Sequence, residues 1–261
     1  MRTVRLWIAY DGTNYAGWQR QVGADTIQEE LERAFGALLG TAVAVHGAGR
    51  TDSGVHALSQ SAHVQIDKGP PSERLHRALN TMLPRDIRVL GAVDVPAGFH
   101  ARFDAIGKRY RYRIRTDPIP FPVGRRYFHW HPYGPVDISA MRSAARHIVG
   151  QHDFACFATN SRNTKPRSTV RTIRSIHIFG DERGVDIAVQ GDGFLYNMVR
   201  TIAGSLLDIG RGKREADWIL EVLRSRDRRS AGAVLPPEGL MLVRVLYPRS
   251  FGRMAALGYR R

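Results

Sequence analysis

A glycine-rich stretch near the start of the chain carries side chains that could do chemistry on a bound substrate. Residues 47–57, here called the Asp52 loop, read Gly-Ala-Gly-Arg-Thr-Asp-Ser-Gly-Val-His-Ala, with the cation Arg50 two residues before the carboxylate Asp52. A carboxylate can serve as a nucleophile or a base, and a neighbouring cation favours its ionised form. Asp-Ser-Gly alone is ordinary turn chemistry, but the full string is far more specific. It is not a phosphate-binding loop, which ends in Gly-Lys-Ser or Gly-Lys-Thr.

A second charged pattern runs along Lys108–Arg115, where arginines at every other position alternate with Tyr110, Tyr112 and Ile114. The two-residue period of a strand puts four guanidinium groups on one face and the two tyrosines on the other. Two interpretations stay open. The arginines are either a solvated face over a tyrosine-bearing core, or a surface that meets RNA.

The composition favours a nucleic-acid partner. The chain has 261 residues and 39 Lys+Arg against 24 Asp+Glu, a net charge of +15. Such an excess points to a polyanion, of which nucleic acid is the commonest. Most of the excess is arginine, which suits phosphate forks and base stacking. A basic protein without a polyanion partner is the alternative.

The same composition excludes several classes. Hydrophobic residues make up 43 %, too many for a disordered chain. The single cysteine, Cys156, excludes an internal disulfide and a cysteine cluster for zinc. We find no apolar core of signal-peptide length in the first ten residues and no run long enough for a membrane span. We therefore expect a soluble, cytoplasmic protein without a membrane contact.

The elements that must position the Asp52 loop follow the order βαββαβ, a ferredoxin-like unit. Alternation or apolar runs predict strands at Val4–Tyr10, Ala42–His46, Leu58–Ile66 and Ile87–Val95. Helices are predicted from Thr26, whose side chain opens a capping box, to Gly40, and from a Ser72 cap to Leu83.

The second half repeats this order with additions. The predicted elements are a strand at Lys108–Arg115, a helix at Asp137–Val149, a hairpin of Thr172–Phe179 and Val185–Gln190, helices at Phe194–Ile209 and Ala216–Arg224, and a strand at Met241–Tyr247. We expect an α+β fold of two tandem ferredoxin-like (RRM-like) units, joined in one extended mixed, mostly antiparallel sheet. The helices would lie on one side, with a central cleft where the units meet. The domains would be 1–104 and 105–261.

Two connecting segments have alternative interpretations. Asp117–Pro135 is rich in aromatic residues, and we favour a packed connection because large aromatics are usually buried. RNA stacking or a subunit interface is the alternative. Asp153–Arg171 is a polar, basic loop that is either mobile surface or a phosphate grip.

The Asp52 loop resembles the signature of the TruA family of tRNA pseudouridine synthases. Five further stretches resemble the family's other motifs, in the right order: Tyr10–Thr13 with Gly17–Gln19, Phe99–Phe103 with Lys108–Tyr112, Gly150–Phe154, Phe194–Arg200 and Pro237–Leu240. The resemblance runs from Tyr10 to Pro248. It implies the pseudouridine synthase fold and the isomerisation of uridine to pseudouridine at positions 38, 39 and 40 of the anticodon stem-loop of tRNA.

The resemblance also implies roles for single residues. Asp52 would be the catalytic nucleophile, Tyr110 would stack on the target base, and Arg200 would be the partner that keeps the aspartate ionised. Arg50 would enter the RNA to help displace the target base. The expected substrate and RNA contacts come from Arg50, Thr51, Lys108, Arg109, Arg111, Leu195 and Arg167. We expect a homodimer, and we expect neither a cofactor nor a metal.

Two rival functions are the alternatives to this assignment. A non-catalytic RNA-binding protein would explain the charge but not the Asp52 loop. A metal-dependent nuclease or deaminase would use a cluster such as His46, Asp52, His56 and His63. The deaminase type of zinc site needs a Cys-x-x-Cys sequence, which is absent here. The sequence leaves three routes open for Asp52: attack on the uracil ring, attack on the sugar, or removal of a sugar proton.

Overall fold

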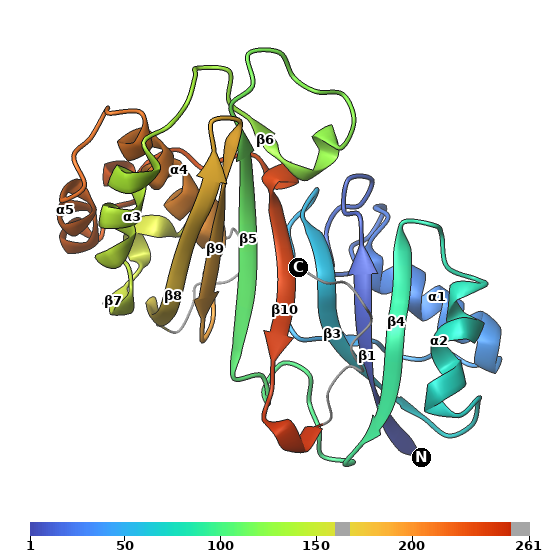
Figure 1. The fold of residues 1–261 in the computed structure, drawn as a ribbon. Coiled ribbons are helices and arrows are strands. Elements are labelled where there is room, and N and C mark those ends of the chain that lie inside the picture. The colour runs from blue at the N-terminus through green and yellow to red at the C-terminus, as the bar shows by residue number, and fades with distance from the viewer. Residues whose placement is uncertain (160–167, 252–261) are drawn as a thin grey trace. The chain divides into compact units, whose positions relative to one another are not determined.

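The structure is a computed structural model that describes residues 1–159 and 168–251. The chain folds into two compact units (Figure 1). Unit 1 consists of Met1–Ile106 and the C-terminal stretch from Leu242, and unit 2 consists of Gly107–Met241. Each unit combines strands with helices, so the predicted α+β class is confirmed.

Unit 1 is built on strands in the order β4-β1-β3-β10, with the short β2 paired to β3. Their bounds are β1 Arg2–Tyr10, β2 His46–Gly47, β3 His56–Ile66, β4 Ile87–Val95 and β10 Leu240–Leu246. The central strand β1 is antiparallel to both β3 and β4. The order β4-β1-β3-β2 is that of a ferredoxin-like unit, as the element order predicts.

Local sequence signals set the two helices of unit 1, α1 (Ile27–Leu39) and α2 (Ser72–Asn80). Thr26 caps α1 by accepting a hydrogen bond from the Glu29 N–H, and Gly40 ends it at a φ of 69°, both as predicted. The prediction that Ser72 caps α2 is wrong. Its hydroxyl accepts a hydrogen bond from Nη1 of Arg2 at 3.0 Å, and it lies within the first turn.

The predicted strand Ala42–His46 is also wrong, because strand pairing begins only at His46. Two side chains of α1 take the backbone groups of Val45 instead. The Val45 N–H donates to Oε1 of Glu32 at 3.1 Å, and its carbonyl accepts from Nε2 of Gln28 at 3.1 Å. These bonds satisfy a buried backbone that would otherwise need a neighbouring strand.

Unit 2 has strands in the order β5-β9-β8-β7, all antiparallel, with β6 parallel to β5. Their bounds are β5 Gly107–Arg115, β6 His129–Trp130, β7 Gly150–Asp153, β8 Val170–Asp181 and β9 Gly184–Gly191. The hairpin of β8 and β9 was predicted. The short strands β6 and β7 were not, since two to four residues are too few to show a period.

Three helices complete unit 2: α3 Ile138–Arg146, α4 Met198–Gly210 and α5 Trp218–Ser225. They gather beside β8 and β9 in Figure 1, with α3 against both β8 and α4. The expected start of α4 at Phe194 is wrong, because Asn197 has a φ of 61° and cannot belong to a right-handed helix. In the described ranges 1–159 and 168–251, no helix combines the length and the apolar character that crossing a bilayer requires.

The aromatic stretch between β5 and α3 is not the packed connection that we favoured. Phe121 is 63 % exposed and Tyr133 is 70 % exposed, and Tyr127 is also exposed. Trp130 is better packed, and its Nε1 donates to the Asp117 carbonyl at 2.9 Å. Large exposed aromatic side chains are typical of surfaces that bind another molecule.

The cap of α3 provides a test of how this helix is held. The Asp137 carboxylate accepts a hydrogen bond from the Ala140 N–H at 2.9 Å while its side chain is exposed. We expect Asp137→Ala to lower the free energy of unfolding by about 1 kcal/mol, the usual cost of losing an N-cap. The matched Asp137→Ser variant keeps an acceptor oxygen and should stay close to wild type in urea denaturation. Equal losses in both variants would contradict a capping role.

Candidate active site

The Asp52 loop is held by the segment that follows β1. The Thr51 carbonyl accepts a hydrogen bond from the Trp18 N–H at 3.0 Å, and the Gly54 N–H donates to the Tyr15 carbonyl at 3.4 Å. One bond lies before Asp52 and the other after it. Together they fix the backbone from which the carboxylate extends, and Asp52 itself is half-buried.

Within the loop, Asp52, Ser53 and Gly54 form the turn that their composition predicts. The Asp52 carbonyl accepts from the Val55 N–H at 3.1 Å, and Gly54 has a φ of 77°, which glycine adopts without steric cost. Gly47 is required for another reason. A Cβ atom there would lie 2.4 Å from Cε2 of Trp18. Asp52 takes part in the turn through its backbone carbonyl. Its side-chain carboxylate can therefore have a chemical role in addition to the turn.

Two predicted RNA-contacting residues precede Asp52 and differ in exposure. Arg50 is exposed, and its Nε donates to Oε1 of Gln19 at 3.3 Å. Thr51 is only 6 % exposed, and its hydroxyl lies 2.8 Å from the Tyr10 hydroxyl. Burial raises the pKa of Tyr10, so this is a neutral hydrogen bond at physiological pH. Thr51 thus supports the loop through a buried hydrogen bond, and its contact with RNA stays a prediction.

Strand β5 carries the predicted arginine row. Burial alternates along it, with Tyr112 and Ile114 buried and the four arginines exposed or half-buried, so the predicted two-residue period is confirmed. The Tyr112 hydroxyl donates to the Pro236 carbonyl at 2.8 Å, which makes Tyr112 part of the core of unit 2. Its neighbour on the same face, Tyr110, belongs to the predicted catalytic set.

The arginines of β5 have unequal partners. Arg109 is exposed and donates from Nε and Nη2 to Oε1 of Gln190, at 3.2 Å and 2.7 Å. The Asp186 carboxylate lies 3.3 Å from Nε of Arg113 and 3.8 Å from Nη1 of Arg111. Burial lowers the pKa of Arg111, although a guanidinium stays protonated in proteins. Because the partner of Arg109 is a neutral amide, these contacts compensate its charge less than those of Arg111 and Arg113.

Tyr110 lies beside the segment that leads into α4. It is buried, and its ring meets the Phe194 ring edge to face, with centroids 5.0 Å apart and planes at 82°. Phe194 and Leu195 belong to the motif that ends at Arg200. Leu195 is 8 % exposed. Its contact with substrate, like that of half-buried Lys108, stays a prediction.

Arg200 sits in the first turn of α4 with an oriented guanidinium group. Its Nε donates to the Leu235 carbonyl at 2.6 Å, and its Nη1 donates to Oδ1 of Asn197 at 2.8 Å. Both acceptors are neutral oxygens. They fix the plane of the guanidinium without neutralising its positive charge, as a partner for a carboxylate requires.

Sequence reasoning missed the part of Asn197. This residue has a left-handed conformation at the start of α4, which asparagine tolerates better than most residues. Its Oδ1 receives Arg200, while its Nδ2 donates to Oγ1 of Thr159 at 2.8 Å. We infer that Asn197 is a positioning residue. The only signal in the sequence was its place in the Phe194–Arg200 motif. Arg167 lies outside the described residues.

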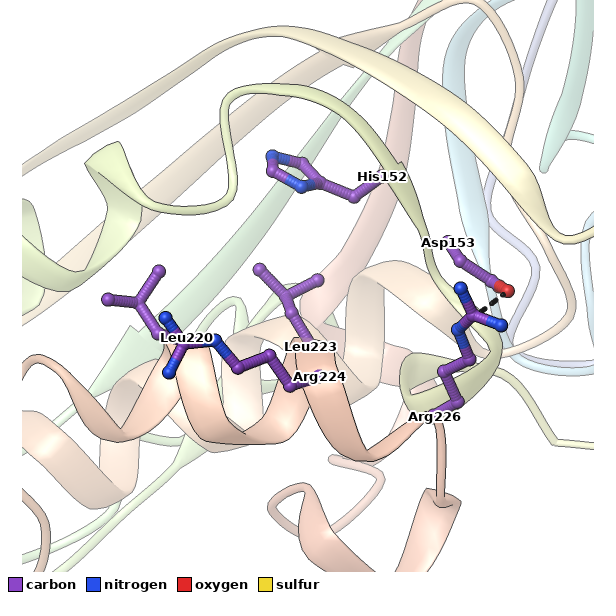
Figure 2. Close-up of a pocket in the computed structure, with 6 residues that line it drawn as sticks. All are labelled: His152, Asp153, Leu220, Leu223, Arg224 and Arg226. Atoms are coloured by element: carbon purple, nitrogen blue, oxygen red, sulfur yellow. Dashed lines mark ion pairs between the residues drawn. The ribbon is translucent and has the colours of Figure 1, made fainter.

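A pocket of about 430 Å³ lies elsewhere in unit 2, between β7 and α5 (Figure 2). Its lining residues are His152, Asp153, Leu220, Leu223, Arg224 and Arg226. Asp153 and Arg226 form an ion pair of 3.4 Å, and a hydrogen bond from Thr169 lowers the pKa of Asp153. No residue of the predicted site lines this pocket. The Gly150–Phe154 motif contains β7, and its Asp153 contacts Arg226 at the end of α5 through this ion pair.

The cluster considered for a metal is not formed. Among the described residues, no group of three or more His, Cys, Asp or Glu side chains is arranged to hold a metal ion.

Comparison with known proteins identifies the family. A family model described as tRNA pseudouridine synthase matches residues 6–104 and 144–248. Proteins named tRNA pseudouridine synthase A from Geobacter sp. (strain M21), Thermoanaerobacter sp. (strain X514) and Acetivibrio thermocellus are each 44 % identical, over 95 % of this chain and 100 % of their own lengths.

A solved chain titled "Crystal Structure of a Cbf5-Nop10-Gar1 Complex" matches 91 % of this chain and 57 % of its own length. At a TM-score of 0.37 and 11 % identity, this likeness is too weak to support an argument. The family model and the curated relatives agree with the motifs, and the chain belongs to the tRNA pseudouridine synthase family.

Proposed function

We propose that this enzyme isomerises uridine to pseudouridine at positions 38, 39 and 40 of the anticodon stem-loop of tRNA, with Asp52 as the catalytic group. The family supports the isomerisation of uridine in tRNA. The observation that carries the assignment to Asp52 is the pair of hydrogen bonds that hold its loop on both sides. Both bonds come from a segment more than 30 residues earlier in the chain, so tertiary contacts fix the backbone at Asp52.

The reaction explains why a carboxylate is needed. The bond from C1′ of the ribose to N1 of uracil breaks, a bond from C1′ to C5 forms, C5 loses a proton and N1 gains one. No atom is added and no electron is lost, so the reaction needs no redox cofactor or energy donor, and we propose that it proceeds without a metal. Asp52 supplies the electron pair, as a nucleophile or as a base.

The other residues of the site assist that step. Arg200 keeps the aspartate ionised, because an adjacent cation lowers the pKa of a carboxyl group. The Tyr110 ring stacks on the detached uracil and takes the proton from C5. We propose that both residues act on the same uridine as Asp52. Residues 1–104 then supply the aspartate, and residues 105–261 supply the tyrosine and the arginine.

Binding of tRNA supplies the energy for base flipping, which costs a few kcal/mol. Arg50 is exposed two residues before Asp52 and enters the RNA to help displace the target base. Thr51, Lys108, Arg109, Arg111, Leu195 and Arg167 contribute further contacts to the substrate. A net charge of +15 supports binding through phosphates, and we place the enzyme in the cytoplasm with its tRNA.

We also propose a homodimer that binds tRNA across two subunits. The exposed aromatic side chains at 121, 127 and 133 support it, because such residues are enriched at protein interfaces.

Asp52→Asn tests the catalytic assignment. An amide is neither a comparable nucleophile nor a base, so we expect turnover to fall by several orders of magnitude. Asparagine suits the turn, so the fold should survive. Loss of one negative charge should leave the Kd for tRNA unchanged or slightly lower. Tritium release from C5-labelled uridine measures turnover, and filter binding measures Kd.

The matched control is Asp67→Asn, which removes an exposed carboxylate in the same unit. Its turnover should equal that of wild type. Near-normal turnover by a folded Asp52→Asn protein would contradict the catalytic role.

Transcripts with altered anticodon arms test the target positions. A tRNA with uridine at 38, 39 and 40 replaced by cytidine, with compensating changes in the paired strand, should bind but yield no pseudouridine. Restoring one uridine should restore one equivalent. Full conversion in the triply substituted tRNA would refute this choice of positions.

Sedimentation at micromolar concentration tests the dimer. We expect a mass of two chains, and we expect Tyr133→Asp to shift the equilibrium toward one chain and reduce tRNA affinity. A wild-type monomer with full activity would exclude the dimer as a functional requirement.

A further inference from the structure

Four aromatic rings form a continuous series on unit 1, beginning at His46, which directly precedes the Asp52 loop. His46 and His63 are stacked with centroids 5.0 Å apart and planes at 26°, and His63 lies 4.8 Å from His100. His100 in turn lies 4.3 Å from Phe103, with planes at 31°. We call these four residues the ring stack. Nothing in the proposed reaction uses them.

Two rings of the stack are fixed in orientation because His63 and His100 accept backbone hydrogen bonds. The Ala101 N–H donates to Nδ1 of His63 at 3.1 Å, and the N–H groups of Arg102 and Phe103 donate to Nδ1 of His100 at 3.1 Å and 3.4 Å. An Nδ1 atom that accepts carries no proton. Burial lowers the pKa of His63 to about 4, so this ring is neutral at physiological pH.

The outer end of the stack is open to solvent. Phe103 is 74 % exposed, although its ring is held against His100. The guanidinium of exposed Arg102 lies 5.8 Å from the Phe103 ring centroid. Asp104 is the neighbouring carboxylate, and it accepts the His100 N–H at 2.7 Å. A fixed aromatic face beside a cation is the arrangement that single-stranded nucleic acids use for stacking.

The turn at Asp52 and the ring stack lie at different levels of β3. Thr51 contacts Tyr10, which pairs with Ala57 at the start of β3. His63 lies six residues further along β3, a distance of about 20 Å at the rise of a strand.

We propose that Phe103 stacks on an unpaired nucleobase of the RNA substrate other than the reacting uridine, while Arg102 pairs with an adjacent phosphate. This inference rests on the proposed function, since it takes the substrate to be tRNA. It adds a contact that selects for RNA shape away from the target. Binding costs little side-chain conformational entropy at Phe103, because the orientation of its ring is already fixed in the free protein.

Substitutions at Phe103 test the ring stack in the full-length protein with a tRNA transcript. Phe103→Ala should raise Kd about 5- to 150-fold, the usual effect of losing one stacked base. Turnover at saturating tRNA should not change. Phe103→Trp should bind within about twofold of wild type, because tryptophan keeps a π face. Phe103→Leu keeps apolar area without that face and should resemble Phe103→Ala. Met82→Ala, an exposed apolar residue of the same unit, is the control and should bind like wild type.

A photoreactive phenylalanine analogue at position 103 locates the contact. We expect a cross-link to an unpaired nucleotide other than the modified uridine. An unchanged Kd for Phe103→Ala, or cross-links only to protein, would overturn the inference. A shift from dimer to monomer in Phe103→Ala would also overturn it, because it would assign the ring to a subunit interface. Failure of wild type to isomerise tRNA would refute the proposed function separately, since it does not depend on position 103.

Discussion

The hydrogen bonds from the segment after β1 to the Asp52 loop are the constraint on which the proposed site depends. Trp18 and Tyr15 bind the backbone on the two sides of Asp52. Each such bond contributes only about 0.5–1.5 kcal/mol to net stability. Their importance is positional, because an error of about 1 Å at a reacting group can cost a hundredfold in rate. The Tyr10–Thr51 contact adds a third, buried attachment from the strand itself.

In unit 2, one pleated strand combines packing with charge. The alternation along β5 places Tyr112 in the core and the arginines on the opposite face. Packing of Tyr112 therefore fixes the strand and, with it, the direction of the arginine side chains. Asp186 is shared by Arg111 and Arg113, whereas Arg109 is held by an amide. The strand therefore keeps a graded rather than a uniform positive surface, on which the charge of Arg109 is less compensated than the charges of Arg111 and Arg113.

How far the sequence predicted these features depended on the distance between interacting groups. Thr26 and Gly40 act on their own helix, so local rules found them. Val45 was misassigned because its backbone binds Glu32 and Gln28, a choice that no periodicity shows. Asn197 was placed inside a helix because its left-handed φ, which lets it bind Arg200, leaves no mark on the apolar pattern. Asp52, Tyr110 and Arg200 were assigned by resemblance, since residues so far apart in sequence cannot be grouped by spacing alone.

The return of the chain to unit 1 has a consequence for its synthesis. Unit 1 needs the strand β10, which lies beside β3, yet all of Gly107–Met241 separates Ile106 from Leu242. During translation, unit 1 waits for its last strand until all of Gly107–Met241 has been made. Until then most of the edge of β3 that will pair with β10 is unpaired, and an unpaired edge is a site of aggregation. A premature stop shortly before Leu242 would thus release a chain in which unit 1 lacks its last strand. Unit 1 is the part that was made first, and it carries Asp52.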